Sequence, residues 1–115
     1  MKRYKKIRPR KEGFVFVGYR EDFDAKQMIA VRIISKPVAV FKRENGSFFA
    51  REMSCKHQGA DLTTSPINGK LVTCSRHGWQ YDVETGACTN RDSPKLREHE
   101  VVIENNAVFV GFYPR

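Results

Sequence analysis

The chain has 115 residues, with 21 lysines and arginines against 13 aspartates and glutamates, and three cysteines. This length favours one domain with a hydrophobic core, and no stretch approaches the length of a transmembrane helix. The sparse cysteines exclude a disulfide framework and no secretory segment is evident, so we expect a soluble, cytoplasmic protein.

Positive charge is concentrated at the N-terminus. Residues 2–11 contain seven of the lysines and arginines and no acidic residue before position 12, whereas the rest of the chain is nearly neutral. We interpret residues 1–12 as a solvated, flexible tail. The alternative is an arm that steers an acidic partner or touches nucleic acid or phospholipid, although nucleic acid is not the partner we expect.

Short runs of strand-forming residues, separated by turn signals, predict an all-β domain. The expected strands are, in chain order, residues 14–18, 28–34, 38–44, 47–53, 71–73, 79–83, 100–104 and 107–112. Residues 21–27 are expected to form a loop, and Pro37 to end the second strand. Asn45-Gly46 and Asn68-Gly69 are hairpin signals, because both residue types tolerate positive φ. Asn105-Asn106 turns a closing hairpin.

The candidate metal-binding residues lie between residues 55 and 77. This stretch reads Cys55-Lys56-His57, then sixteen residues, then Cys74-Ser75-Arg76-His77. Thiolate and imidazole are side chains that hold iron or zinc. Zinc fingers usually group their two cysteines before their two histidines. An alternation of cysteine and histidine is instead what a Rieske [2Fe–2S] centre needs, where two histidines replace two cysteines on one iron.

The flanking residues strengthen this interpretation. Residues 55–60 (CKHQGA, the first box) and 74–82 (CSRHGWQYD, the second box) closely resemble the two cluster-binding boxes of Rieske ferredoxins and of the Rieske domains of ring-hydroxylating oxygenases. The resemblance implies one [2Fe–2S] cluster, with Cys55 and Cys74 on the inner iron and His57 and His77 on the outer iron. It also implies the Rieske fold. In this fold, residues 13–115 form a single domain, an antiparallel β-sandwich base carrying a small inserted cluster-binding subdomain at residues 54–92.

Further residues around the cluster follow from the same resemblance. Gly59 and Gly78 suit tight backbone paths beside the ligands. Tyr81 matches a tyrosine that lies next to a ligand sulfur in the family, and Trp79 stands where high-potential members have a serine. Residues 90–94 fall where the family has a loop covering the cluster, although only Pro94 matches.

The same alignment of motifs bears on the reduction potential. High-potential Rieske proteins join the two boxes by a disulfide, whose positions are Ala60 and Arg76 here. The missing disulfide and the missing serine hydroxyl favour a midpoint in the lower part of the Rieske range.

The implied function is a soluble one-electron carrier that passes electrons from a reductase to an oxygenase or another terminal acceptor. The remaining histidine, His99, is expected to be a half-exposed strand residue, so this chain by itself lacks the two histidines of a mononuclear oxygenase iron site. Lys56 and Arg76 flank the ligands and are expected to meet acidic groups of a redox partner.

Two other interpretations stay open. One is the small Rieske subunit of a nitrite reductase, which would co-purify with a large flavin- and haem-containing subunit. The other is a zinc-stabilised binding module, which iron analysis would distinguish. The sequence assigns no role to Cys88.

Overall fold

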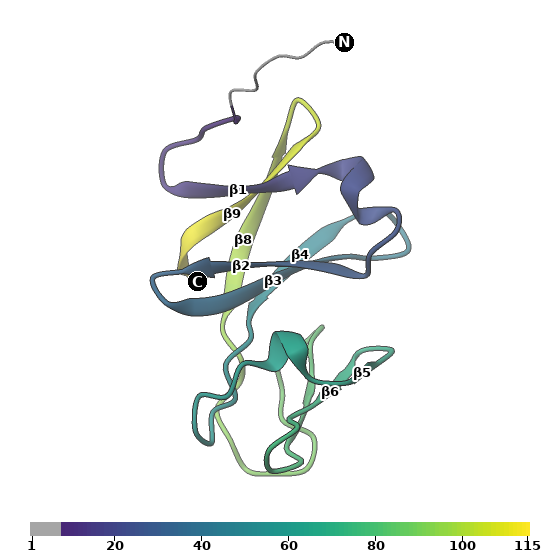
Figure 1. Cartoon of the computed structure of the whole chain (residues 1–115), viewed down its shortest axis with the longest axis vertical. Helices are drawn as coiled ribbons and strands as arrows, with labels where there is room; N and C mark the ends of the chain where they lie inside the picture. Colours follow the sequence, from purple (N-terminus) through teal and green to yellow (C-terminus); the bar gives the residue numbers. More distant parts are fainter. Residues whose placement is uncertain (1–7) are drawn as a thin grey trace.

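The computed structural model describes residues 8–115, and most of the expected tail lies outside these residues. A six-stranded antiparallel sheet, the base, has the order β1-β9-β8-β4-β3-β2, and a small sheet has the order β5-β6-β7 (Figure 1). The base strands are β1 (Phe14–Tyr19), β2 (Met28–Ile33), β3 (Lys36–Lys42), β4 (Phe48–Glu52), β8 (Glu98–Glu104) and β9 (Ala107–Pro114). The small sheet contains β5 (Ile67–Asn68), β6 (Leu71–Thr73) and β7 (Gln80–Asp82).

The prediction of an all-β fold is confirmed. Within residues 8–115, the helices are two short 3₁₀ turns, η1 (Arg20–Phe23) and η2 (Leu62–Thr64). In this part of the chain no helix is long and apolar enough to cross a membrane. The first of these turns lies where a loop was expected, and Phe23 inserts from it into the core of the base.

The turns follow from residues that tolerate positive φ. Gly46 has a φ of +90° in the β3–β4 turn, and Asn105 and Asn106 have φ values of +51° and +72° between β8 and β9. Two successive positive φ values suit the two-residue turn at Asn105-Asn106, whereas the β3–β4 turn is longer, closed by a hydrogen bond from the N–H of Arg43 to the carbonyl of Ser47 (2.8 Å). The sequence signals at these positions therefore predicted hairpins that the structure contains.

The prediction that Pro37 ends a strand is wrong. Pro37 lies inside β3 and faces Arg32 of β2, while the chain reverses at Ile34 and Ser35, with φ values of +50° and +61°. Proline is tolerated near the first residue of a strand. Its carbonyl accepts a hydrogen bond from the N–H of Met53 (2.7 Å), so the missing N–H does not prevent pairing on the β4 side.

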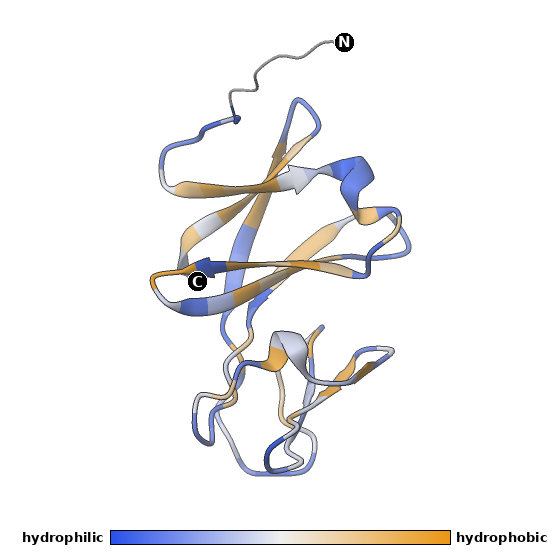
Figure 2. Ribbon diagram, viewed as in Figure 1, coloured by the Kyte–Doolittle hydropathy of each residue, from blue (hydrophilic) through white to orange (hydrophobic). Residues whose placement is uncertain are grey.

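The β3–β4 hairpin is buried on both faces. Val38, Val40 and Ala50 point into a core inside the base, where the two edge strands β1 and β2 also contact each other. Ala39 and Phe41 point the other way, into a second core shared with the small sheet. Because side chains alternate along a strand, one hairpin serves both cores. Figure 2 shows the resulting hydrophobic strands of the base.

The chain leaves the base from β4, forms the small sheet and returns through β8. These two strands are neighbours, since Ala50 pairs with His99 and Arg51 with Glu98. The excursion therefore begins and ends at one place in the base. In Figure 1 the small sheet and its loops form the lower end of the molecule.

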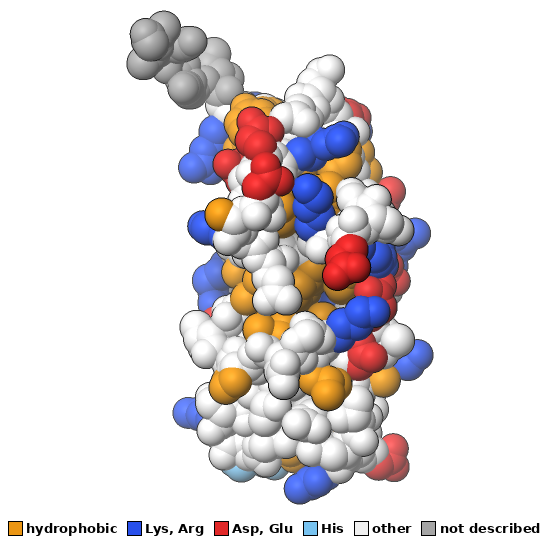
Figure 3. Space-filling view, turned by 90° about the vertical axis from the view of Figure 1, so that its right-hand side faces the viewer, with side chains coloured by type: hydrophobic (Ala, Val, Ile, Leu, Met, Phe, Trp, Pro, Cys, Tyr) orange, Lys and Arg blue, Asp and Glu red, His pale blue; other side chains and the backbone are white. Residues whose placement is uncertain are grey.

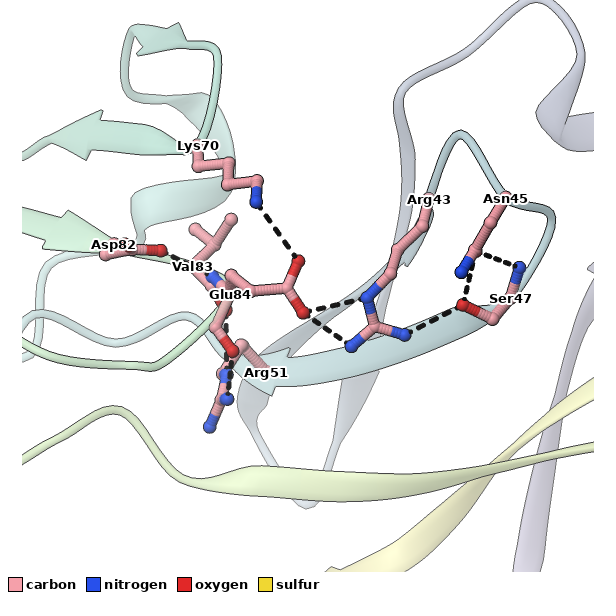
Figure 4. A network of polar contacts seen from close by, with 8 residues as sticks. All are labelled: Arg43, Asn45, Ser47, Arg51, Lys70, Asp82, Val83 and Glu84. Atoms are coloured by element: carbon pink, nitrogen blue, oxygen red, sulfur yellow. Dashed lines mark hydrogen bonds and ion pairs between the residues drawn. The ribbon is translucent and has the colours of Figure 1, made fainter.

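Arg51 on β4 is buried and fastens the small sheet to the base. Its guanidinium donates to the carbonyl oxygens of Val83 (2.8 Å) and Glu84 (2.6 Å), as Figure 4 shows. It also donates to the carbonyl oxygen of Leu96 (3.2 Å). Burial lowers the pKa of Arg51, but a guanidinium stays charged in proteins. These bonds compensate for burying the charge while joining three segments of chain.

A second, more exposed link lies beside it. The Arg43 guanidinium at the end of β3 forms an ion pair with the Glu84 carboxylate, and the Lys70 ammonium lies 3.7 Å from the same group. The hydrogen bond from Arg43 holds the pKa of Glu84 below its ordinary value. The turn after β7 is thus tied to the β3–β4 hairpin.

Candidate metal centre

The two boxes form loops with the same backbone pattern. The N–H of Gly59 donates to the carbonyl of Cys55 (2.7 Å), and the N–H of Gly78 donates to the carbonyl of Cys74 (3.0 Å). In each loop the cysteine N–H also donates to the carbonyl five positions further on, at 2.8 Å in both cases. The glycines have φ values of +71° and +75°, a region that side chains with a Cβ disfavour.

The two thiols are buried together at the base of these loops. Cys55 and Cys74 are each 2% exposed and belong to the core shared by the two sheets. Burial alone would raise the pKa of the Cys74 thiol. Hydrogen bonds from the backbone N–H groups of Arg76 and His77 and from the Cys55 thiol outweigh burial, and the pKa of Cys74 lies below its ordinary value. The loop therefore favours a thiolate, the form that binds metals.

The two imidazoles lie side by side at the loop tips. His57 and His77 are exposed, their Nδ1 atoms are 3.1 Å apart, and their rings are nearly perpendicular, at 81°. Figure 3 shows histidine side chains at the surface of the lower end of the molecule. Two ring nitrogens aimed at each other at this separation can share one metal ion.

The donors thus come as two pairs of different chemistry, a buried sulfur pair and an exposed nitrogen pair. In residues 8–115 no three His, Cys, Asp or Glu side chains gather as a single-ion site.

Tyr81 lies behind the first box. Its side chain is completely buried, and its hydroxyl accepts a hydrogen bond from the N–H of Lys56 (3.0 Å) and lies 3.8 Å from the Cys55 sulfur. Burial raises the pKa of Tyr81, while hydrogen bonds with the N–H of Lys56 and with the Ser93 side chain act in the opposite direction. The tyrosine is therefore neutral, with a proton available for the Cys55 sulfur.

Trp79 connects the two boxes. Its backbone belongs to the second box, whereas its ring stacks on the His57 imidazole of the first, with centroids 4.8 Å apart and planes 30° apart. The loop after β7 contacts this region through Asn90, which bonds to the backbone on both sides of Trp79. Pro94 is exposed, and its part in the site stays a prediction.

The remaining predicted residues differ in their surroundings. Lys56 is half-buried and Arg76 is exposed, each next to a histidine in sequence. The prediction of a half-exposed His99 is wrong, because its side chain is 4% exposed and its Nδ1 lies 2.7 Å from the Gly111 carbonyl oxygen. His99 is far from the loop tips in sequence and is already hydrogen-bonded.

Sequence reasoning missed Arg51, and it placed residues 90–94 beside the cluster without assigning a role to Asn90 or Ser93. All three act through contacts with backbone or hydroxyl groups of distant segments. Their residue types are ordinary for loops and strands, so the sequence did not indicate what their side chains contact. The spacing of the turn signals around residue 86 was the nearest clue, because it brings the following loop back beside β7.

Comparison with known protein sequences identifies related chains. The family model described as the Rieske [2Fe-2S] domain matches residues 13–104. The oxidoreductase NdmD of Pseudomonas putida is 32% identical over 82 residues, which are 68% of this chain but only 14% of NdmD. The ferredoxin component of the p-cumate 2,3-dioxygenase system of Pseudomonas putida is 31% identical over 98 residues, covering 82% of this chain and 83% of that protein.

Solved structures agree on the fold. A chain in the complex of reduced oxygenase and oxidized ferredoxin of carbazole 1,9a-dioxygenase superposes with a TM-score of 0.76 at 24% identity. The superposition covers 91% of this chain and 98% of that one. With a family model matching most of its length and with cysteine and histidine at all four motif positions, the chain belongs to the Rieske [2Fe-2S] domain family.

Proposed function

We propose that this protein is a one-electron carrier that passes electrons from a reductase to an oxygenase or another terminal acceptor. The observation that carries the proposal is the exposed His57–His77 pair, 3.1 Å apart, in front of two buried thiols. The ferredoxin component of the p-cumate system, similar over most of both chains, supports an electron-transfer role rather than substrate chemistry.

We further propose that Cys55 and Cys74 hold the inner iron of the family's [2Fe–2S] cluster and that His57 and His77 hold the outer iron. The donor set fits, because two pairs suit two irons of different ligation better than one four-coordinate zinc. When bound, the cluster supplies the redox chemistry, taking up one electron in a range of roughly −150 to +300 mV. Residues 54–92 would form the cluster-binding subdomain within a domain of residues 13–115.

The exposed imidazoles would be the electron port of the protein. The thiols lie in the shared core, whereas the imidazoles reach the surface of the lower end. Lys56 and Arg76 adjoin this port, so we propose that redox partners present carboxylates there. Complementary charge acts mainly on the rate of association.

Electron paramagnetic resonance of the dithionite-reduced protein tests these proposals. We expect a Rieske spectrum, with one electron taken up per two irons in a coulometric titration. His57→Ala and His77→Ala should each abolish the spectrum. His99→Ala is the matched control, and it should keep the spectrum although it removes a buried hydrogen bond. Stoichiometric zinc in place of iron, or a spectrum lost only in His99→Ala, would contradict the ligand assignment.

We also propose that the protein works in the cytoplasm. The three cysteines are free, and Cys88 is partly exposed. A partly exposed free thiol is typical of reducing compartments. Fractionation of cells that express the protein at its natural level would test this location, and recovery in an extracytoplasmic fraction would contradict it.

A further inference from the structure

The side chain of Asn90 extends the pairing of β7 beyond the end of the neighbouring backbone. The segment after the turn at Gly86 runs back beside β7, and the N–H of Thr89 donates to the carbonyl of Gln80 (2.8 Å). At the next residue the Asn90 amide continues this pattern. Its Oδ1 accepts from the N–H of Gln80 (3.0 Å), and its Nδ2 donates to the carbonyl of Gly78 (3.0 Å).

These two backbone groups lie on either side of Trp79. The carbonyl of Trp79 closes the second box by accepting from the N–H of Cys74 (2.8 Å). Its indole stacks on His57, whose ring lies 4.3 Å, between centroids, from that of His77. Asn90 therefore restrains the residue whose ring contacts the imidazole pair, without touching that pair itself.

We propose that Asn90 is a positioning residue for the redox centre. It fixes the backbone around Trp79 and thereby keeps the indole against His57, which orients the imidazole and keeps water from one of its faces. The proposal rests on the ligand role of His57 proposed above. The residue acts through Trp79 and not through its own dipole.

Loss of the Asn90 side chain should raise the midpoint potential of the cluster. Two ferric ions, two sulfides and two thiolates sum to a formal charge of about zero, so reduction adds net negative charge. Without Asn90 the indole is freer and water reaches His57 more easily. More polar surroundings stabilise the more highly charged, reduced state, and the midpoint potential therefore rises.

The first test compares Asn90→Ala with Asn45→Ala in the cluster-loaded protein. Asn45 is a matched control, because its Oδ1 also accepts a backbone hydrogen bond in a turn, from the N–H of Ser47 (3.0 Å), but on the β3–β4 hairpin. Trp79 is the single tryptophan of the chain, so its fluorescence reports this site alone. We expect Asn90→Ala to shift the emission to the red, change the g-values of the reduced protein and raise the midpoint. Asn45→Ala should do none of these.

A double-mutant cycle tests whether Asn90 acts through Trp79. Trp79→Ala should raise the midpoint like Asn90→Ala, and the double variant should show no additional rise. An equal further rise in the double variant, or unchanged Trp79 emission in Asn90→Ala, would overturn the proposal.

The test still works if Asn90→Ala does not fold or if the proposed function fails. If Asn90→Ala does not fold, Asn90→Asp keeps the acceptor for Gln80 but sets a carboxylate oxygen against the Gly78 carbonyl in place of the donor, so a red shift is expected there too. No shift in a folded Asn90→Asp would count against the proposal. If the wild-type protein lacks a Rieske spectrum, the proposed function fails, and the emission still shows whether Asn90 restrains Trp79.

Discussion

The two sulfur atoms of the candidate centre receive hydrogen bonds from different sources. Backbone N–H groups of its own loop reach the Cys74 sulfur. The Cys55 sulfur instead faces the Tyr81 hydroxyl. The hydroxyl accepts from the N–H of Lys56, and it can donate its own proton to the Cys55 sulfur, which lies 3.8 Å away. Hydrogen bonds to sulfur stabilise the reduced cluster and raise its potential.

Tyr81→Phe should therefore lower the midpoint potential from a value that we already expect in the lower part of the Rieske range. The phenyl ring fills the same buried space, so the change removes a hydroxyl and little packing. A redox titration followed by visible circular dichroism would measure the shift. Phe41→Leu, in the same core but without a polar contact, is the control. A midpoint that does not fall in Tyr81→Phe would show that the hydroxyl does not act on Cys55.

Single residues also show what the sequence could predict about the site. The four motif positions carry rare residue types at a distinctive spacing, so they were recognisable without coordinates. Asn90 carries a common loop residue type, and its role depends on where the chain returns after Gly86. Arg51 resembles an ordinary solvent-facing strand residue, yet carbonyl oxygens more than thirty positions away satisfy it.

At the scale of elements, hairpins were predictable where asparagine and glycine marked the turns. The turn at Ile34 and Ser35 was not, because neither residue type favours positive φ. Pro37 is the stronger local signal, so the end of the strand was predicted there and not at this turn. The β2–β3 pairing and the hydrogen bond from Arg32 to the carbonyl of Ser35 (2.8 Å) stabilise the turn. Pairing of the two strands therefore overrode the propensity of the turn residues.

Gly86 sits where the turn after β7 meets the base. A Cβ there would lie 2.6 Å from the Leu96 carbonyl oxygen, and its φ is +83°. Gly86→Ala should destabilise the protein by about 1–2 kcal/mol from the left-handed backbone alone, and by more because of the collision. Gly46→Ala is the matched control, with a φ of +90° and no atom within 4 Å of the added carbon. Urea unfolding would compare them, and equal losses would contradict the close approach.

The Arg43–Glu84 ion pair between the two sheets makes the stability of the fold depend on pH. The pKa of Glu84 is lowered in the folded protein. Its contribution to the free energy of unfolding is therefore complete at a pH above the pKa of the unfolded state, about 4.3. This contribution is lost as the pH falls through the pKa of the folded state. Glu84→Gln should cost about 1 kcal/mol at neutral pH and flatten the fall in stability below pH 4.3. Thermal unfolding from pH 6 to pH 3 would measure both effects. Parallel curves for the two proteins would contradict them.

Across the whole molecule, the candidate electron port and the described start of the chain occupy opposite ends. Lys11 forms an ion pair with Glu104 (2.7 Å) and lies over Phe14, which places the entering chain at the β1 and β8–β9 end of the base. The small sheet and its loops form the other end (Figure 1), and histidine side chains lie at the surface of that end (Figure 3). Basic residues at the two ends should therefore have separable effects on docking.

Reversing the charges of Lys56 and Arg76 to glutamate should slow electron transfer to an acceptor oxygenase by on the order of tenfold at low salt. The difference should shrink as salt shortens the Debye length to about 10 Å at 0.1 M. Removal of residues 1–10 is the comparison, and it should matter less. Stopped-flow rates over a salt series would decide. Unchanged rates for the double reversal, with a large loss for the truncation, would move docking to the tail.

Because the β3–β4 hairpin is buried on both faces, the base and the small sheet cannot simply be separated or exchanged. The excursion between β4 and β8 starts and ends at adjacent strands, so a short linker could replace it without stretching the chain. The resulting base, however, would expose Ala39, Phe41 and Phe49, which now contact the small sheet. An apolar surface of this kind promotes self-association. Another scaffold that receives the two loops would therefore have to supply an equivalent apolar surface beneath them. A base without the small sheet would need polar residues at these three positions to stay monomeric.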